Sequence, residues 1–150
     1  MATATLKFTT GAQYVQEANF IWDNSVPDSM IDINGNVTQF NATTGVFDAI
    51  PLPYGSEVVG GMVETQVVSN DAGTATVSVG DSALTTRYIT TTDVKTALAS
   101  AALVPTGRSS LGEPIRITVA NNTGGATTGK IKVRVLYVVA NRQTENLKTK

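Results

Sequence analysis

Lys130-Ile131-Lys132-Val133-Arg134-Val135-Leu136-Tyr137-Val138-Val139 is the stretch that decides the fold of this chain. Its apolar side chains alternate with basic ones up to Arg134, which is the period of a β-strand with one buried face. The stretch Pro114 to Ala120 has the same pattern, with Ile115, Ile117 and Val119 on one side. The residues between them, 121 to 125, are Asn-Asn-Thr-Gly-Gly and tolerate positive φ. The pattern therefore predicts that the two strands pair as a hairpin with a long connection.

Composition extends this prediction to the whole chain. Thr occurs 23 times and Val 18 times, and both are β-branched residues that favour strands over helices. Residues 57 to 68 and 74 to 79 are predicted to form a second hairpin. In the first strand Val59, Val63 and Val67 would share one face, with a bulge at Gly60-Gly61, and in the second Ala75, Val77 and Val79 would point inward. Further strands are expected over 46 to 52, and over 30 to 33 and 37 to 40, which the turn residues Asn34-Gly35 would join.

These short strands, separated by turns rich in Gly, Asn and Asp, indicate an all-β fold. We expect an antiparallel two-sheet sandwich of jelly-roll kind, with at most one short helix. The helix candidate is Asp93 to Ala102, with Thr92 as its N-cap. Residues 1–45 are predicted to be an N-terminal arm or edge segment that packs on the sandwich or on a partner. Residues 46–140 would form the sandwich domain and 141–150 a polar tail.

Several classes of function are disfavoured by composition. The 150 residues include no His and no Cys, so the commonest metal ligand, the commonest general base and thiolate chemistry are absent. The longest uncharged apolar run, 135 to 140, is far shorter than the roughly 20 residues that cross a bilayer, so no membrane partner is expected. We predict a protein that is not an enzyme and has no catalytic, cofactor or metal site.

Charge is unevenly distributed along the chain. Residues 1 to 128 carry five basic and eleven acidic residues, a net charge of −6, whereas residues 129 to 150 carry six basic and one acidic residue, a net charge of +5. A nucleic-acid surface would need aromatic residues among the basic ones, and Tyr137 is the only aromatic residue there. We therefore interpret the basic stretch as a solvated strand face followed by a polar tail, and expect no nucleic-acid partner.

Two short motifs imitate catalytic or metal-binding sites. Gly80-Asp81-Ser82 resembles the nucleophile block of lipase-like esterases, but without a His nothing activates the serine hydroxyl, so a turn is predicted. Asp28, Asp32, Asn34 and Asn36 resemble part of an EF-hand loop, but the required Gly and the closing Glu are missing. A turn is the expected structure there too.

An apolar cluster near the N-terminus is the candidate partner interface. Phe20, Ile21 and Trp22 are adjacent, and Met30 follows shortly after. Aromatic side chains often anchor protein interfaces. Burial of the cluster under the sandwich is the competing interpretation, and the sequence alone does not choose between them.

Four stretches of the chain together resemble a family, the head decoration (cement) proteins of tailed bacteriophages. The resemblance covers about residues 46 to 139. It is carried by residues 47–55 with 59–61, 77–82 with 87–88, 102–107, and 115–120 with 129–137. It implies a structural virion protein that binds the outer surface of a capsid and stabilises it, with the major capsid protein as partner. It further implies a homotrimer, and it carries no catalytic residue or cofactor.

The alternative function is a receptor- or carbohydrate-binding β-sandwich module of a phage tail. Such a module would need exposed aromatic side chains on its loops, because sugar rings stack on aromatic faces. Trp22 and the four Tyr residues are the candidates for that role.

Overall fold

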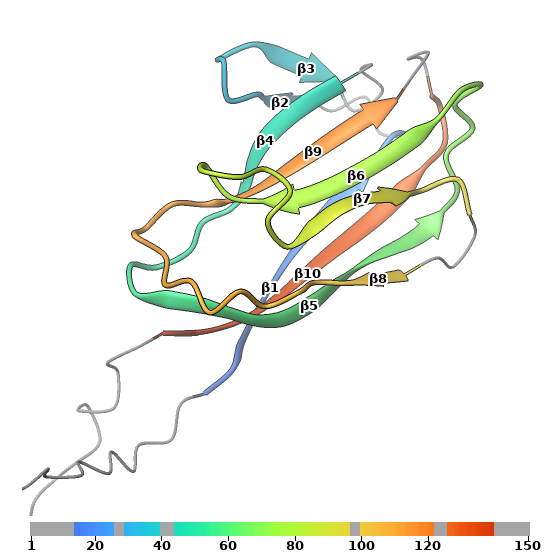
Figure 1. The fold of residues 1–150 in the computed structure, drawn as a ribbon. Coiled ribbons are helices and arrows are strands. Elements are labelled where there is room, and N and C mark those ends of the chain that lie inside the picture. The colour runs from blue at the N-terminus through green and yellow to red at the C-terminus, as the bar shows by residue number, and fades with distance from the viewer. Residues whose placement is uncertain (1–13, 26–28, 40–43, 97–99, 122–125, 140–150) are drawn as a thin grey trace, which may run out of the picture.

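The computed structural model shows two four-stranded antiparallel sheets packed face to face, with a small separate hairpin (Figure 1). It describes residues 14–25, 29–39, 44–96, 100–121 and 126–139. The first sheet has the order β1-β10-β5-β8 and the second β4-β9-β6-β7. The hairpin consists of β2 and β3. The strand bounds are β1 Gln16–Asp23, β2 Ser29–Ile31, β3 Val37–Gln39, β4 Thr44–Ile50, β5 Ser56–Val67, β6 Ala75–Gly80, β7 Ile89–Asp93, β8 Ser100–Ala102, β9 Ile115–Asn121 and β10 Lys130–Val139.

The strand pairs are nested along the chain. β1 pairs with β10, β4 with β9, β5 with β8, and the innermost pair is β6 with β7. This nesting of first with last, folded over into two sheets, is the jelly roll. The predicted all-β antiparallel sandwich of jelly-roll kind is therefore confirmed. β1, which lies within the predicted N-terminal segment, forms one edge of the first sheet.

Two predicted hairpins are wrong because the nesting sends successive strands to opposite sheets. β9 and β10 do not pair with each other: β9 lies between β4 and β6, and β10 lies between β1 and β5. Likewise β5 and β6, which we expected to pair around residues 70–73, belong to different sheets. The Asn34-Gly35 hairpin is confirmed, since β2 pairs with β3 and Gly35 has a φ of 84°. The two strands of each wrongly predicted hairpin still bury their apolar faces, but they face each other from opposite sheets instead of pairing within one sheet.

The predicted helix over Asp93 to Ala102 is wrong within the described residues. Asp93 ends β7, and Ser100–Ala102 forms β8, which pairs with Met62 to Glu64 of β5. Val94 is buried and donates its backbone N–H to the carbonyl of Ala75 at 3.0 Å. Long-range strand pairing therefore overrides the local helix propensity of this Ala-rich stretch.

The core between the sheets consists mainly of Val and Ile. The predicted inward faces of β6, β9 and β10 are confirmed, because the following side chains are no more than 4% exposed: Ala75, Val77, Val79, Ile115, Ile117, Val119, Ile131, Val133 and Val135. Phe47 of β4 is fully buried among them.

β5 changes its inward face along its length. Val58 and Val63 are buried, whereas Val59 is 38% and Val67 47% exposed, so the prediction that Val59, Val63 and Val67 share one face is wrong. The pairing with β10 shifts once beside Val59 and once near Val67. Each shift inserts one residue and reverses the alternation. The predicted irregularity near Gly60-Gly61 is confirmed, and Gly61 has a φ of 137°.

Candidate interaction surfaces

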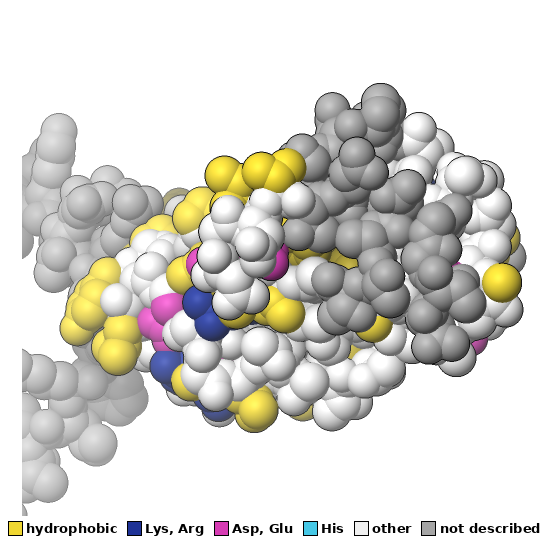
Figure 2. Space-filling model, turned by 90° about the horizontal axis from the view of Figure 1, so that it is seen from above, with side chains coloured by type: hydrophobic (Ala, Val, Ile, Leu, Met, Phe, Trp, Pro, Cys, Tyr) yellow, Lys and Arg dark blue, Asp and Glu magenta, His cyan; other side chains and the backbone are white. Residues whose placement is uncertain are grey.

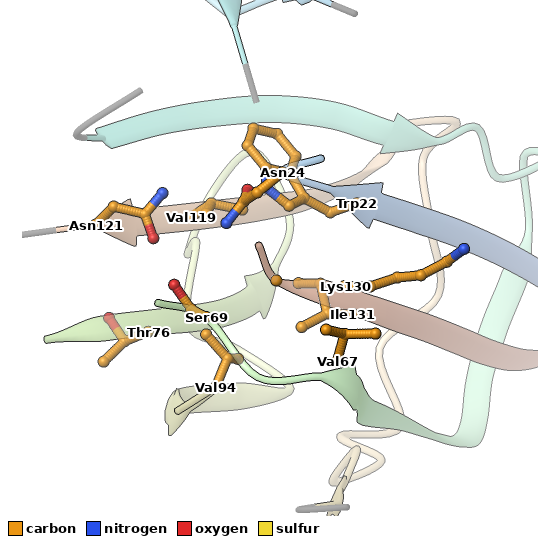
Figure 3. A pocket seen from close by; sticks show the side chains of 11 residues that line it. Trp22, Asn24, Val67, Ser69, Thr76, Val94, Val119, Asn121, Lys130 and Ile131 are labelled. Atoms are coloured by element: carbon orange, nitrogen blue, oxygen red, sulfur yellow. The ribbon is translucent and has the colours of Figure 1, made fainter. Parts of the chain in front are cut away.

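The predicted interface residues of β1 point to opposite faces of the first sheet. Trp22 is 2% exposed and its ring centroid lies 5.0 Å from that of Phe47 on β4. Its indole N–H donates to Asn24 Oδ1 at 2.5 Å, and Figure 3 shows the two side chains next to each other. Phe20 is half-buried against the same core, whereas Ile21 is 48% exposed on the outer face. Trp22 is thus a core residue of the sandwich, and Ile21 is the member of this triplet that faces outward.

Met30 lies in β2, and its side chain is outside the described residues. Its neighbours on the hairpin form a surface that the sequence analysis did not single out. Ile31 and Val37 are directly paired across the hairpin and are 66% and 71% exposed, and Ile33 at the turn is 41% exposed. The hairpin belongs to neither four-stranded sheet and lies beside β4 (Figure 1), where the Ile33 N–H donates to the carbonyl of Val46 at 3.0 Å. The sequence signal for this surface is the Asn34-Gly35 turn, which has Ile and Val residues on both sides. Strands of three residues are too short to be covered by neighbours on both faces.

The outer face of the first sheet carries matched charges. Lys130 Nζ lies 3.3 Å from an Asp23 carboxylate oxygen, and Arg134 Nε lies 3.4 Å from Glu17 Oε1. A hydrogen bond from the Ser25 hydroxyl, together with Lys130, lowers the pKa of Asp23 even though desolvation acts in the opposite direction. Lys130 and Arg134 thus have acidic partners on β1, and Lys130, Lys132 and Arg134 are all partly exposed, which fits the prediction that the basic side of β10 faces solvent.

A charged cluster fastens the loops at one end of the sandwich. Asp81 is 2% exposed and accepts hydrogen bonds from the backbone amides of Ala83 and Leu84 at 3.0 and 2.9 Å. It also forms ion pairs with Arg87 and Arg108. Burial by itself would raise the pKa of Asp81, but these hydrogen bonds outweigh it and lower the pKa from its ordinary value. The cluster ties the loop between β6 and β7 to the loop between β8 and β9.

The turn predicted for Gly80-Asp81-Ser82 is confirmed by these amide hydrogen bonds, and Ser82 is exposed. The turn predicted around Asp32 is confirmed as well. The Asp32 carboxylate accepts hydrogen bonds from the backbone amides of Asn34 and Asn36, both at 2.8 Å. Asp28 lies outside the described residues. Asp32 and Asp81 thus each accept hydrogen bonds from backbone amides of their own turn.

Two hollows of very different size lie in the described part of the molecule. One, beneath Trp22, has a volume of about 10 Å³ and is lined by the residues labelled in Figure 3. That is about the space of one water molecule, so it excludes an organic ligand. The other is an open groove of about 440 Å³ between β7 and β8, lined by Thr86 to Thr92 with Ala101, Ala102 and Val104. Arg87 is the charged residue in the lining of this groove. Because its guanidinium is already paired with Asp81, it is not free to bind a ligand.

Exposed apolar side chains are a prominent feature of the described surface. Figure 2 shows hydrophobic side chains in several groups on the face seen from above, at one end next to neighbouring acidic and basic side chains. Large apolar residues more than 60% exposed are Tyr14, Ile31, Val37, Tyr54, Val104 and Leu111. Of these, Ile31 and Val37 are paired with each other across the hairpin, and adjacent exposed apolar side chains are typical of surfaces that bind other proteins. The described part of the chain contains no helix that could span a membrane.

Comparison with known proteins gives structural matches only. No protein-family model matches the chain, and no curated protein matches it. A chain of the cyanophage Pam1 capsid asymmetric unit is similar over 93% of this chain and 94% of its own length, with a TM-score of 0.58 and 21% identity. A chain of the acid-stable capsid of Helicobacter pylori bacteriophage KHP30 is similar over 87% and 90%, with a TM-score of 0.55 and 20% identity. At this identity the matches show a shared fold.

Proposed function

We propose that this protein is a structural component of a bacteriophage virion that binds the outer surface of the capsid and stabilises it. The observation that carries the proposal is the similarity, over nearly the full length of both chains, to chains from two phage capsid structures. A decoration (cement) role fits a single compact sandwich that covers almost the whole of each matched chain. The major capsid protein is then its partner.

The surface supports binding to a large protein assembly. The paired side chains Ile31 and Val37 project from a hairpin that belongs to neither four-stranded sheet, so they can enter a groove of a neighbouring subunit without any rearrangement of the core. The buried Asp81 joins the loop between β6 and β7 to the loop between β8 and β9 through its ion pairs with Arg87 and Arg108. A stiff module with exposed apolar contacts loses little conformational entropy on binding.

We also propose that the protein acts as a homotrimer. Three linked copies would bind a symmetric shell with higher avidity than one copy, because the second and third contacts become intramolecular. Light scattering should then give a mass of about 47 kDa, three times the 15.7 kDa of one chain. A monomeric mass at micromolar concentration would contradict the trimer.

The test of the function uses shells assembled from the major capsid protein alone. Purified protein should sediment with these shells up to a saturating ratio and should raise the temperature at which they dissociate. Absence from the pellet at saturating concentration would refute the proposal. Binding to glycans on an array, without binding to shells, would instead support the receptor-binding alternative, although Trp22, the largest stacking face in the chain, is buried.

A matched pair of double variants tests the hairpin. Ile31→Asn with Val37→Asn should weaken binding to shells roughly tenfold, because interface energy is concentrated in a few apolar anchors. Val104→Asn with Leu111→Asn removes side chains of similar exposure, 62% and 69%, from other loops, and should leave binding within about twofold. Equal effects of the two pairs would refute a specific role of the hairpin.

A further inference from the structure

Among the described residues, the edge strands of the two sheets are β1, β8, β4 and β7, and they differ in how their outer edges are protected. β1 runs for eight residues beside β10 with no shift of register. β4 has a shift between Asp48 and Ile50, and β7 pairs with a shift and is five residues long. β8 has only three residues. Bulges and short length are the usual protections of an edge. Among the described strands, β1 therefore has the longest regular edge.

The sequence of β1 also lacks the residues that normally block an edge. It contains no Pro and no Lys, and its inward-facing residues carry no charge. Its two acidic residues, Glu17 and Asp23, face outward beside basic residues of β10. About half of the eight residues direct their backbone N–H and C=O away from β10, as in any edge strand. Such an edge is a template for one more strand.

The inner side of this edge is incompletely covered. Ala18 and Phe20 pack against the core but remain partly exposed. On the outer side Ile21 is 48% exposed, and Val15, directly before the strand, is 58% exposed. An added strand with apolar side chains facing inward would bury the exposed parts of Ala18 and Phe20. The edge thus offers apolar contact as well as hydrogen bonds.

Charge indicates what kind of strand fits. β1 carries two acidic residues and no basic one, so two β1 edges would bring like charges together. The other described edges give no better match within a second copy, since β4 carries Asp48, β7 carries Asp93 and β8 is uncharged. Like charges opposite each other destabilise a strand pair, and opposite charges stabilise it. A strand that complements this edge therefore carries a basic residue.

We propose that the free edge of β1 binds an extended segment of the major capsid protein, which adds to the first sheet as a fifth strand. The segment alternates apolar residues, which cover Ala18 and Phe20, with polar ones, and it places a Lys or Arg beside Glu17. Backbone hydrogen bonds supply the affinity, and the apolar flank and Glu17 supply the selectivity. This inference deepens the proposed function and rests on it.

Charge reversal with a matched control tests the edge. Glu17→Lys replaces an edge acid that pairs with Arg134, and Asp48→Lys replaces the corresponding edge acid of β4, which pairs with Arg116 at 2.7 Å. Each change replaces a negative charge by a positive one, a net change of +2, and breaks one ion pair on an edge strand. Glu17→Lys should weaken binding to shells of the capsid protein roughly tenfold, and Asp48→Lys less than twofold. Equal effects would overturn the inference.

Hydrogen exchange separates failure of this inference from failure of the function. In the shell-bound protein, the outward amides of residues 16–23 should exchange much more slowly than in the free protein. Binding without this protection would overturn the edge assignment and leave the capsid function intact, whereas absence of binding would overturn both. Full protection already in the free protein would show that a second copy or the chain itself covers the edge, and would overturn the assignment to the capsid protein.

A proline pair gives a second check that does not depend on charge. Ala18 and Asn19 are adjacent, so one of them directs its N–H outward and the other toward β10. Of Ala18→Pro and Asn19→Pro, the variant that keeps the wild-type melting temperature has lost an outward donor. That variant should bind shells at least tenfold more weakly, and wild-type binding by it would overturn the inference.

Discussion

The buried carboxylate of Asp81 gives the sharpest test of how the loops are held. Asp81→Asn keeps the shape of the side chain and one oxygen for the amides of Ala83 and Leu84. It removes the negative charge and turns an amide NH₂ group toward Arg87 and Arg108, so that donors face donors. The variant should fold, because the sandwich core does not include Asp81, but it should be much less stable.

The expected loss is about 3 kcal/mol in the free energy of unfolding. Removing one partner of a buried ion pair costs about 3–5 kcal/mol. The two arginine side chains are 22% and 28% exposed, so they recover part of this by hydration, which places the effect at the lower end. Asp48→Asn is the control, since its pair with Arg116 has a carboxylate that is 45% exposed. It should cost less than about 1 kcal/mol.

The effect should depend on pH in a fixed direction. Because the pKa of Asp81 is lowered in the folded protein, the ionised group stabilises the fold above its unfolded pKa, near 3.9. That contribution is lost as the pH falls through the folded pKa. The difference in free energy of unfolding between the wild type and Asp81→Asn should therefore be constant above about pH 5 and should become smaller below about pH 4.

Urea unfolding at pH 7 and at pH 3 measures both effects. Trp22 is the only tryptophan and is buried against Phe47, so its fluorescence reports the unfolding of the core. A loss below about 1 kcal/mol for Asp81→Asn at pH 7, or one equal to that of Asp48→Asn, would refute the argument that the cluster holds the loops. A stability difference between the wild type and Asp81→Asn that became larger at low pH would show that folding does not lower the pKa of Asp81.

Three further changes test the core, the bulge and the hairpin. Gly61→Ala should cost about 3 kcal/mol or more in thermal or urea unfolding, because its φ is 137° and a Cβ would collide with the backbone of β10. Gly60→Ala, whose Cβ would meet only a side-chain carbon at 3.9 Å, should cost less than about 1 kcal/mol, and equal losses would contradict the bulge. Phe47→Ala should cost about 4 kcal/mol and alter the Trp22 emission of the folded state; unchanged emission would contradict the ring contact. The Ile31→Asn and Val37→Asn double variant should unfold within about 0.5 kcal/mol of the wild type, since both side chains are mostly exposed, and a larger loss in urea would show that they stabilise the fold itself.

How much of the candidate surface could be predicted depended on burial. The sequence singled out Phe20, Ile21 and Trp22 as apolar, but alternation along β1 places Trp22 inside the sandwich and Ile21 outside. It did not single out Ile31 and Val37, because two apolar residues in short strands look like core residues until the hairpin is seen to belong to neither four-stranded sheet. Exposure is a property of the packed chain, so composition alone cannot assign it.

The order of the strands was decided by the tertiary structure. The sequence by itself determined seven of the ten described strands, β2 to β6, β9 and β10, and it missed β1, β7 and β8. For β6, β9 and β10 it also determined which side chains point inward, because alternation with a period of two is a local property of the chain. It could not determine partners: proximity suggested β9 with β10, yet nesting pairs β10 with the distant β1. The stretch from Asp93 to Ala102 likewise has helical propensity but lies in strands at both ends. Both outcomes have one physical reason, which is that burying two apolar sheet faces against each other outweighs local preferences of about 1 kcal/mol or less per residue.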